Sequence, residues 1–189
     1  MRPRPHFYEF IGHWHDQSLL DFYGQMVARF PSGSRFVEVG AWLGRSTAFL
    51  GVEIINSGKT ISVDVIDTWQ GSTDHDEMLS FAQYFDVFSS FWQNMVNGRV
   101  SGLLRPIMLP SVRAARAYDD GELDFVFIDA GHQYEDVKQD ILAWRPKVKA
   151  GGVLAGHDYD SVSDPGVVKA VDELMPGRAV FGRCWMVPI

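Results

Sequence analysis

Four side chains that can bind a metal ion or move a proton follow two apolar runs of the sequence. Asp129 and His132 come after "LDFVFI", and His157 and Asp158 come directly after "GGVLAG". Paired carboxylates suit Mg²⁺ or Mn²⁺, whereas an imidazole shifts the preference toward Mn²⁺, Fe²⁺ or Zn²⁺. If the two runs are neighbouring parallel strands, all four side chains meet at one edge of a sheet. The spacing therefore predicts a site that can hold a metal ion and carry a base.

Each of the four residues also has a purely structural explanation. Asp129 could cap the helix that begins near "QYEDV", and His132 could be a solvated loop residue. His157 and Asp158 could form a hydrogen-bonded turn. The convergence of all four at one edge favours the functional interpretation.

A turn with two glycines follows an earlier apolar run, in the stretch "EVGAWLGRST". Gly40 and Gly44 let the backbone come close to a ligand, and the amides that open the next helix attract a carboxylate or a phosphate. A dinucleotide-binding turn has the pattern Gly-x-Gly-x-x-Gly, and Trp42 stands in the place of its second glycine. The sequence therefore disfavours NAD, and a plain strand-to-helix turn is the alternative to a ligand site.

Asp67 ends the next apolar run, where its carboxylate could accept hydrogen bonds from both hydroxyls of a ribose. Asp64 competes for this role, but strand alternation places it deeper, so Asp67 is preferred. Trp69 stands where it could stack on a base. Ser111 could meet the edge of that base or cap a helix.

Short β-branched runs alternate with longer amphipathic stretches, and this alternation predicts the elements that position these residues. We expect an α/β, doubly wound, Rossmann-like fold with a mostly parallel seven-stranded sheet, an antiparallel C-terminal strand and helices on both faces. The expected strands cover 35–40, 60–67, 104–109, 123–129, 151–158, 179–182 and 184–189. The expected helices cover 16–29, 44–58, 134–145 and 167–174.

The chain is expected to form a single domain over 1–189, with an N-terminal helical cap in 1–34 and a helical insertion in 74–97. One helical stripe of the insertion carries Phe81, Phe85, Phe88, Trp92 and Met95. Such a stripe predicts either a helix packed on the sheet or a lid over a substrate pocket. Trp14, Phe22 and the aromatic residues of 81–92 could also form the face of a homodimer.

Composition excludes several classes of partner. The formal net charge of −7 argues against nucleic acid, because binding to phosphates needs clustered Lys and Arg. No apolar run is long enough to span a membrane or to act as a signal peptide. Cys184 is the only cysteine, so no internal disulfide can form. We therefore expect a cytoplasmic protein without a membrane partner.

Taken together, these segments resemble the class I S-adenosylmethionine-dependent methyltransferases over roughly residues 35 to 189. The stretch "FVEVGAWLGRSTAF" resembles their first cofactor motif, "VIDTWQGS" their ribose-binding acid, and "LDFVFIDAGHQYEDVKQDI" through "GGVLAGHDY" their fourth and fifth strands. More narrowly, the chain is similar to metal-dependent O-methyltransferases of the catechol type and of the macrolide-sugar type that acts on macrocin and mycinamicin.

The resemblance implies a role for each matching residue. It places His132 as general base, because the macrolide-sugar branch has a histidine three residues after its first metal-binding acid. It implies that Asp129 acts in catalysis and that Asp129 and Asp158 bind the metal, while His157 is a further candidate metal ligand from its place beside Asp158. That branch commonly has an acid at the position of His157, and catechol enzymes usually have Asn at the position of Tyr159. The implied cofactor-binding residues are Glu38, Gly40, Ala41, Gly44, Ser46, Asp67, Trp69, Ser111 and Asp129.

The implied reaction is transfer of a methyl group to a hydroxyl of a small-molecule acceptor such as a sugar, a polyol or a phenol. A divalent metal, Mg²⁺ or Mn²⁺, would hold two acceptor oxygens, and His132 would take the proton. Two alternatives remain. One is a metal-dependent hydrolase that uses Asp129, His132, His157 and Asp158, and the other is a non-catalytic module that binds S-adenosylmethionine.

Overall fold

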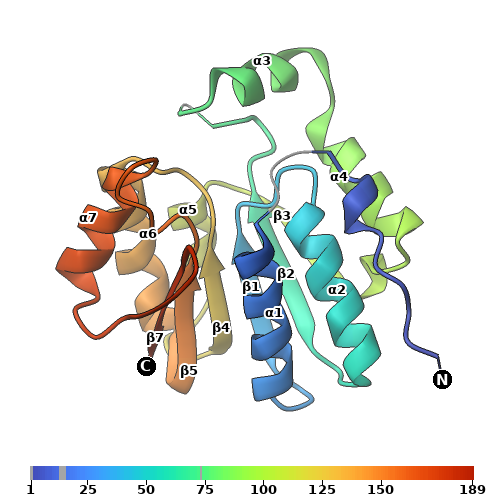
Figure 1. Ribbon diagram of the computed structural model, residues 1–189, viewed down its shortest axis with the longest axis horizontal. Coiled ribbons are helices and arrows are strands. Elements are labelled where there is room, and N and C mark those ends of the chain that lie inside the picture. The colour runs from blue at the N-terminus through green and yellow to red at the C-terminus, as the bar shows by residue number, and fades with distance from the viewer. Residues whose placement is uncertain (1, 13–15, 73) are drawn as a thin grey trace.

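The computed structural model describes residues 2–12, 16–72 and 74–189. Within these ranges the chain forms one seven-stranded sheet in the order β3-β2-β1-β4-β5-β7-β6 (Figure 1). The strands are β1 Arg35–Val39, β2 Ser62–Asp67, β3 Leu104–Met108, β4 Leu123–Ile128, β5 Val148–Gly156, β6 Ala179–Phe181 and β7 Cys184–Pro188. The first five are parallel, and β7 runs antiparallel to both β5 and β6. The predicted Rossmann-like architecture is confirmed.

The part of the chain that the structure describes contains seven α-helices, most of which pack on the two faces of the sheet. They are α1 Gln17–Arg29, α2 Arg45–Ser57, α3 Asp76–Tyr84, α4 Val87–Asn97, α5 Ser111–Ala115, α6 Tyr134–Trp144 and α7 Pro165–Leu174. Gly44 and Gly58 lie at the two ends of α2 with left-handed φ angles of 86° and 70°. The predicted bounds of this helix are therefore confirmed. Glycine suits both ends because it adopts the left-handed conformation without steric cost.

Strand alternation divides the core into two layers, as β4 illustrates. Phe125 and Phe127 face the layer that contains α1, α2 and α4, while Val126 and Ile128 face the layer of α5, α6 and α7. Both faces of β4 are buried, as expected for a central parallel strand. Asp129 follows at its C-terminal end, between the two helical layers.

The stretch 74–97 forms two helices, so its aromatic residues do not lie on one continuous helical face. Helix α3 ends before Phe85, and Asp86 begins α4 by accepting hydrogen bonds from the Ser89 amide at 2.9 Å and the Ser89 hydroxyl at 2.7 Å. An Asp at this position is a strong helix N-cap, and it breaks the predicted stripe. Phe91 is buried in the core, whereas Tyr84 is 81% exposed and Phe85 is 58% exposed.

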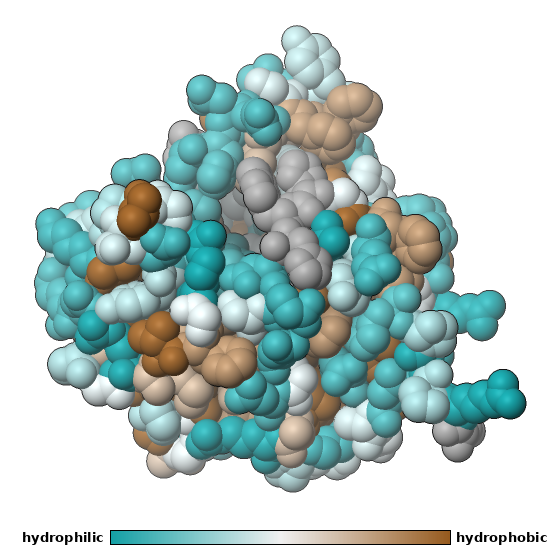
Figure 2. Space-filling view, viewed as in Figure 1, coloured by the Kyte–Doolittle hydropathy of each residue, from teal (hydrophilic) through white to brown (hydrophobic). Residues whose placement is uncertain are grey.

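Helix α3 stands above the sheet at the top of Figure 1. Apolar surface is visible on the same upper lobe in Figure 2. Phe22, one of the aromatic residues considered for a dimer face, is buried in the core, and Trp14 lies outside the described residues.

None of the helices that the structure describes combines the length and the apolar character needed to cross a membrane.

Candidate active site

A cavity of about 990 Å³ opens at the carboxyl ends of β1, β2, β4 and β5. The sheet order places the topological switch between β1 and β4, since their following helices lie on opposite faces. The walls come from the loops after these strands, from the β3–α5 connection and from the start of α1. The volume is near the upper end of the range for small-molecule sites, which is roughly 300 to 1,000 Å³.

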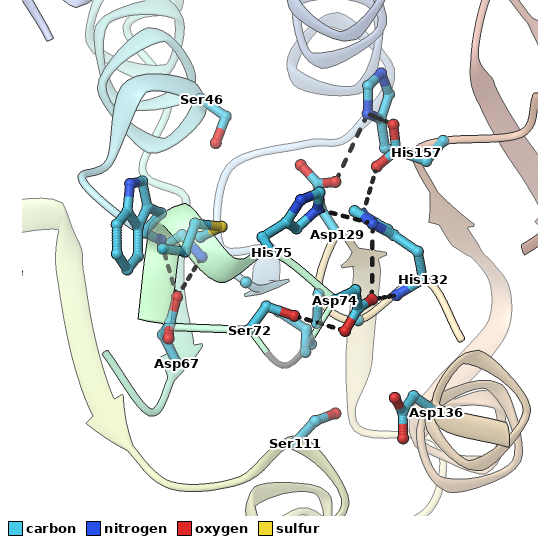
Figure 3. Close-up of a pocket in the computed structure, with 18 of the residues that line it drawn as sticks. Ser46, Asp67, Ser72, Asp74, His75, Ser111, Asp129, His132, Asp136 and His157 are labelled. Atoms are coloured by element: carbon cyan, nitrogen blue, oxygen red, sulfur yellow. Dashed lines mark hydrogen bonds and ion pairs between the residues drawn. The ribbon is translucent and has the colours of Figure 1, made fainter. Parts of the chain in front are cut away.

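The loop after β1 is held by the acid that ends β2. Asp67 accepts hydrogen bonds from the amides of Ala41 and Trp42, both at 2.8 Å, and from the Trp69 amide at 2.7 Å (Figure 3). These residues, apart from Trp69, line the cavity. Asp67 thus braces the loop. Its Oδ2 atom already accepts two amide hydrogen bonds, so Oδ1, which accepts one, keeps a lone pair for a ligand hydroxyl.

Gly40 lets this loop pass close to the neighbouring strand end. Its φ is 88°, and a Cβ built on it would lie 1.9 Å from the carbonyl oxygen of Asp129. Gly44 is similarly confined, because a Cβ there would lie 2.5 Å from the methyl group of Met95. Both glycines predicted at the cofactor loop are therefore required by backbone geometry.

Asp64 takes no part in the cavity wall. Its carboxylate pairs with Arg105 at 2.8 and 2.5 Å and accepts a hydrogen bond from the Tyr118 hydroxyl at 2.8 Å. The expectation that Asp67, and not Asp64, faces a ligand at this strand end agrees with the positions of the two residues.

Glu38 lies behind the cavity and does not line it. Its carboxylate accepts hydrogen bonds from three hydroxyls: Tyr23 at 2.8 Å, Ser46 at 2.7 Å and Thr47 at 2.5 Å. Burial raises the pKa of Glu38 to about 7, although the three hydroxyls oppose the rise. The cofactor-contact role predicted for Glu38 is therefore replaced by a positioning role, in which Glu38 holds Ser46 at the wall.

The buried Glu38 predicts a pH-dependent stability. Its pKa is about 7 in the folded protein and 4.5 for an ordinary glutamate. Stability contributed by this group is thus fully present below about pH 4.5 and is lost as the pH rises through 7. The shift corresponds to a loss of about 3 kcal/mol.

Replacing Glu38 with glutamine should remove this component, so the unfolding free energy of Glu38→Gln should change less between about pH 5 and about pH 8 than that of the wild type. Urea unfolding at both pH values measures the difference. Glu135→Gln, a change at an exposed acid, is the control. An unaltered pH slope in Glu38→Gln would show that Glu38 does not titrate as described.

Trp69 and Ser111, the two residues predicted to contact a nucleobase, bind other parts of the protein. Trp69 is buried among Phe88 and Phe91, and its indole nitrogen donates to the Trp42 carbonyl at 3.0 Å. It does not line the cavity, so the stacking prediction is wrong for this arrangement. Ser111 does line the cavity, but Pro110 is the N-cap of α5, and the Ser111 hydroxyl accepts a hydrogen bond from the Trp144 indole at 2.9 Å.

Asp129 and His132 lie at the opposite side of the cavity from Asp67 (Figure 3), and Asp158 completes a compact cluster with them. Each offers one ligand atom, and these atoms all lie within 4.8 Å of one another. The His132 Nε2 atom lies 3.0 Å from an oxygen of Asp158. Asp158 has a left-handed φ of 57°, a conformation that costs energy for a non-glycine residue and is often found at functional sites.

His157 does not belong to that cluster, contrary to its predicted role as a metal ligand. Its Nε2 atom lies 2.7 Å from Asp16, the N-cap of α1, and its Nδ1 atom lies 3.1 Å from Asp158 and 3.6 Å from Asp129. Burial opposes the charged ring, but the hydrogen bonds and charges of Asp129 and Asp158 raise the pKa of His157 to about 11. Both ring nitrogens thus face carboxylates, and His157 is not among the three residues whose ligand atoms converge.

The pKa of His132 is also raised by the neighbouring carboxylates. Burial would lower its pKa, but the hydrogen bond to Asp158 and the charges of Asp158, Asp129 and Asp164 raise it above the usual value. Arg183 balances the acids on the outer side, with Nη2 at 2.9 Å from Asp158 and 2.6 Å from Asp164.

Sequence reasoning missed several residues that the fold brings to this cavity: Asp16, Asp74, His75, Asp164 and Arg183. An Asp before an amphipathic helix was the available signal for Asp16, and it indicates only an N-cap. Asp74 and His75 belong to a stretch that was interpreted from its aromatic residues alone.

Comparisons with known proteins agree with this geometry. A family model described as a methyltransferase domain matches residues 37–159. The uncharacterized protein y4gI of Sinorhizobium fredii (strain NBRC 101917 / NGR234) is 26% identical over 157 residues, which is 83% of this chain, and the chain spans only 16% of that relative's length.

Two solved structures illustrate the shared fold. The O-methyltransferase NovP has a TM-score of 0.65 at 19% identity, covering 90% of this chain and 79% of NovP. CalS11, described as a TDP-rhamnose 3'-O-methyltransferase of calicheamicin biosynthesis, has a TM-score of 0.56 at 14% identity, covering 89% of this chain and 76% of CalS11. The family match covers well over half of the chain and includes both the glycine loop and the Asp129 cluster, and the chain therefore belongs to the methyltransferase-domain family.

Proposed function

We propose that the protein transfers the methyl group of S-adenosylmethionine to a hydroxyl of a small-molecule acceptor, with help from a divalent metal ion. The observation that carries the proposal is the cluster of Asp129, His132 and Asp158 in the same cavity as the braced glycine loop. The loop supports binding of the methyl donor, and the cluster supports handling of a hydroxyl proton. A hydrolase would leave the loop and Asp67 without a role.

The two carboxylates of the cluster approach one another closely, and paired carboxylates suit Mg²⁺ or Mn²⁺. Asp129 and Asp158 would hold the ion. When bound, such an ion supplies a positive charge that lowers the pKa of an acceptor hydroxyl. His157 stays outside the proposed ligand set because its ring is engaged by Asp16 and by the same two carboxylates.

His132 is proposed to take the hydroxyl proton at Nε2. Without a cation, the neighbouring carboxylates favour the protonated ring, which cannot act as a base. A cation at Asp129 and Asp158 would offset their charge and favour the neutral ring. As the acceptor oxygen forms its bond to the methyl carbon, the bond from that carbon to sulfur breaks, and the proton stays on His132.

The charge of the cavity wall supports a neutral acceptor, such as a sugar, a polyol or a phenol. Eight acids line it: Asp16, Asp67, Asp74, Asp129, Asp136, Asp140, Asp158 and Asp164. Only Arg45 and Arg183 supply permanent positive charge among the described lining residues. A phosphorylated acceptor would be repelled by this excess of carboxylates.

Calorimetric titration of the metal-free protein tests both parts of the proposal. S-Adenosylmethionine should bind, and Mn²⁺ should then bind with an affinity that Asp158→Asn reduces by at least about 10-fold. Asp136→Asn is the matched control, because Asp136 lines the cavity outside the cluster and should leave Mn²⁺ binding unchanged. Failure to bind the methyl donor would overturn the proposed function, and donor binding without Mn²⁺ binding would overturn the metal role alone.

A cytoplasmic location and a homodimer also belong to the proposal. The buried free thiol of Cys184 is compatible with a reducing compartment. Tyr84 and Phe85 on the upper lobe are the exposed aromatic residues that a second copy could cover.

A further inference from the structure

The described residues that follow β2 form one wall of the cavity. Helix α3 contains no fully buried residue and stands apart from the sheet (Figure 1). Ser72, Asp74, His75 and Met78, from the start of α3 and just before it, line the cavity. Contacts of α3 and of the residues just before it therefore hold this wall of the cavity.

One anchor of α3 is apolar and lies on the side of the glycine loop. Phe81 packs edge-on against Trp42, with ring centroids 5.7 Å apart. Trp42 is part of the loop that Asp67 braces. This anchor connects α3 to the proposed site of the methyl donor.

The other anchor is polar and lies on the side of His132. Asp74 Oδ2 accepts a hydrogen bond from the His132 amide at 2.5 Å, and Asp74 Oδ1 accepts one from the Ser72 hydroxyl at 2.9 Å (Figure 3). His75, the N-cap residue of α3, places Nε2 at 3.2 Å from His132 Nδ1. The carboxylate of Asp74 therefore binds the main chain of the residue whose side chain is the proposed base.

We infer that Asp74 is a positioning residue that latches α3 to the β4–α6 loop, so that closing the cavity and placing His132 occur together. The inference rests on the proposed function for its consequence, while the latch itself is a property of the fold. An amide forms a stronger hydrogen bond with a carboxylate than with a neutral acceptor. The bond is also directional, so it fixes the loop that carries His132. Opening of α3 breaks this bond and releases the loop.

Amide hydrogen exchange at His132 in the free protein tests the latch directly. In Asp74→Ala the His132 amide loses its acceptor, and its exchange should be at least about 10-fold faster than in the wild type. S-Adenosylhomocysteine, used as the bound probe, should dissociate at least about 10-fold faster from the same variant, because α3 no longer holds the cavity closed. If Asp74 only stabilised the fold in general, its replacement would not affect exchange at the His132 amide in particular.

Glu77→Ala is the matched control, since Glu77 is an exposed acid on the same helix and should leave both rates unchanged. Wild-type exchange at His132 in a folded Asp74→Ala protein would overturn the latch. If that variant does not fold, Asp74→Asn tests the latch instead, because its neutral oxygen forms a weaker hydrogen bond with the His132 amide. Exchange about threefold faster than in the wild type supports the latch, and a wild-type rate overturns it. If the wild type does not bind the probe, the proposed function fails, but the exchange result still decides the latch.

Discussion

Replacing His132 with alanine is expected to slow methyl transfer by about 10²- to 10⁴-fold, the usual contribution of a positioned general base. The ring lies 3.0 Å from Asp158 and is half-buried in the cavity, beside the carboxylates proposed to hold the metal ion. The rate of S-adenosylhomocysteine formation, with the best acceptor from a panel of sugars, polyols and phenols, measures the loss.

The same variant separates a base from a metal ligand. If His132 takes the proton, Mn²⁺ affinity should change little while turnover falls and the acidic limb of the pH profile disappears. A parallel fall of turnover and Mn²⁺ affinity would instead make His132 a ligand and contradict the base assignment. Full turnover would exclude both roles. His6→Ala is a suitable control, because His6 stacks on Phe49 and bonds to Glu53 outside the cavity.

Replacing Gly40 with alanine is expected to lower the free energy of unfolding by about 2 to 5 kcal/mol and to abolish binding of the methyl donor. Alanine disfavours a φ of 88°, and its Cβ would lie 1.9 Å from the Asp129 carbonyl oxygen, which is backbone and cannot turn away. Either β1 and β4 separate at their ends or the glycine loop moves, and both changes disturb the proposed donor site.

Gly33→Ala is a matched control for Gly40→Ala. Gly33 has nearly the same φ, 90°, but a Cβ there meets nothing within 4 Å. The control therefore measures the backbone cost alone, and the difference between the two variants measures the clash. Urea unfolding and calorimetry with S-adenosylmethionine test both changes. Equal destabilisation by the two substitutions would show that close approach to Asp129 is not what requires Gly40.

The sequence by itself determined the sheet, the strand ends and the position of the site along the chain. Alternation within "LDFVFI" predicts a strand buried on both faces, and the residues after parallel strands must meet at one edge because the chain enters every parallel strand in the same direction. This reasoning predicted that Asp67, Asp129, His132 and Asp158 share one edge, and all four line the same cavity. Gly44 and Gly58 marked the ends of α2 because a left-handed residue there favours glycine.

Only the tertiary structure decided which of these side chains act together. His157 pairs with Asp16, 141 positions away in sequence, and this contact removes it from the metal cluster that local spacing predicted. Trp69 turns into the core because Phe88 and Phe91 pack against it, and Asp74 reaches His132 across 58 positions. Local periodicity determines the face of a strand, but the direction of a loop side chain depends on partners that folding brings from distant parts of the chain.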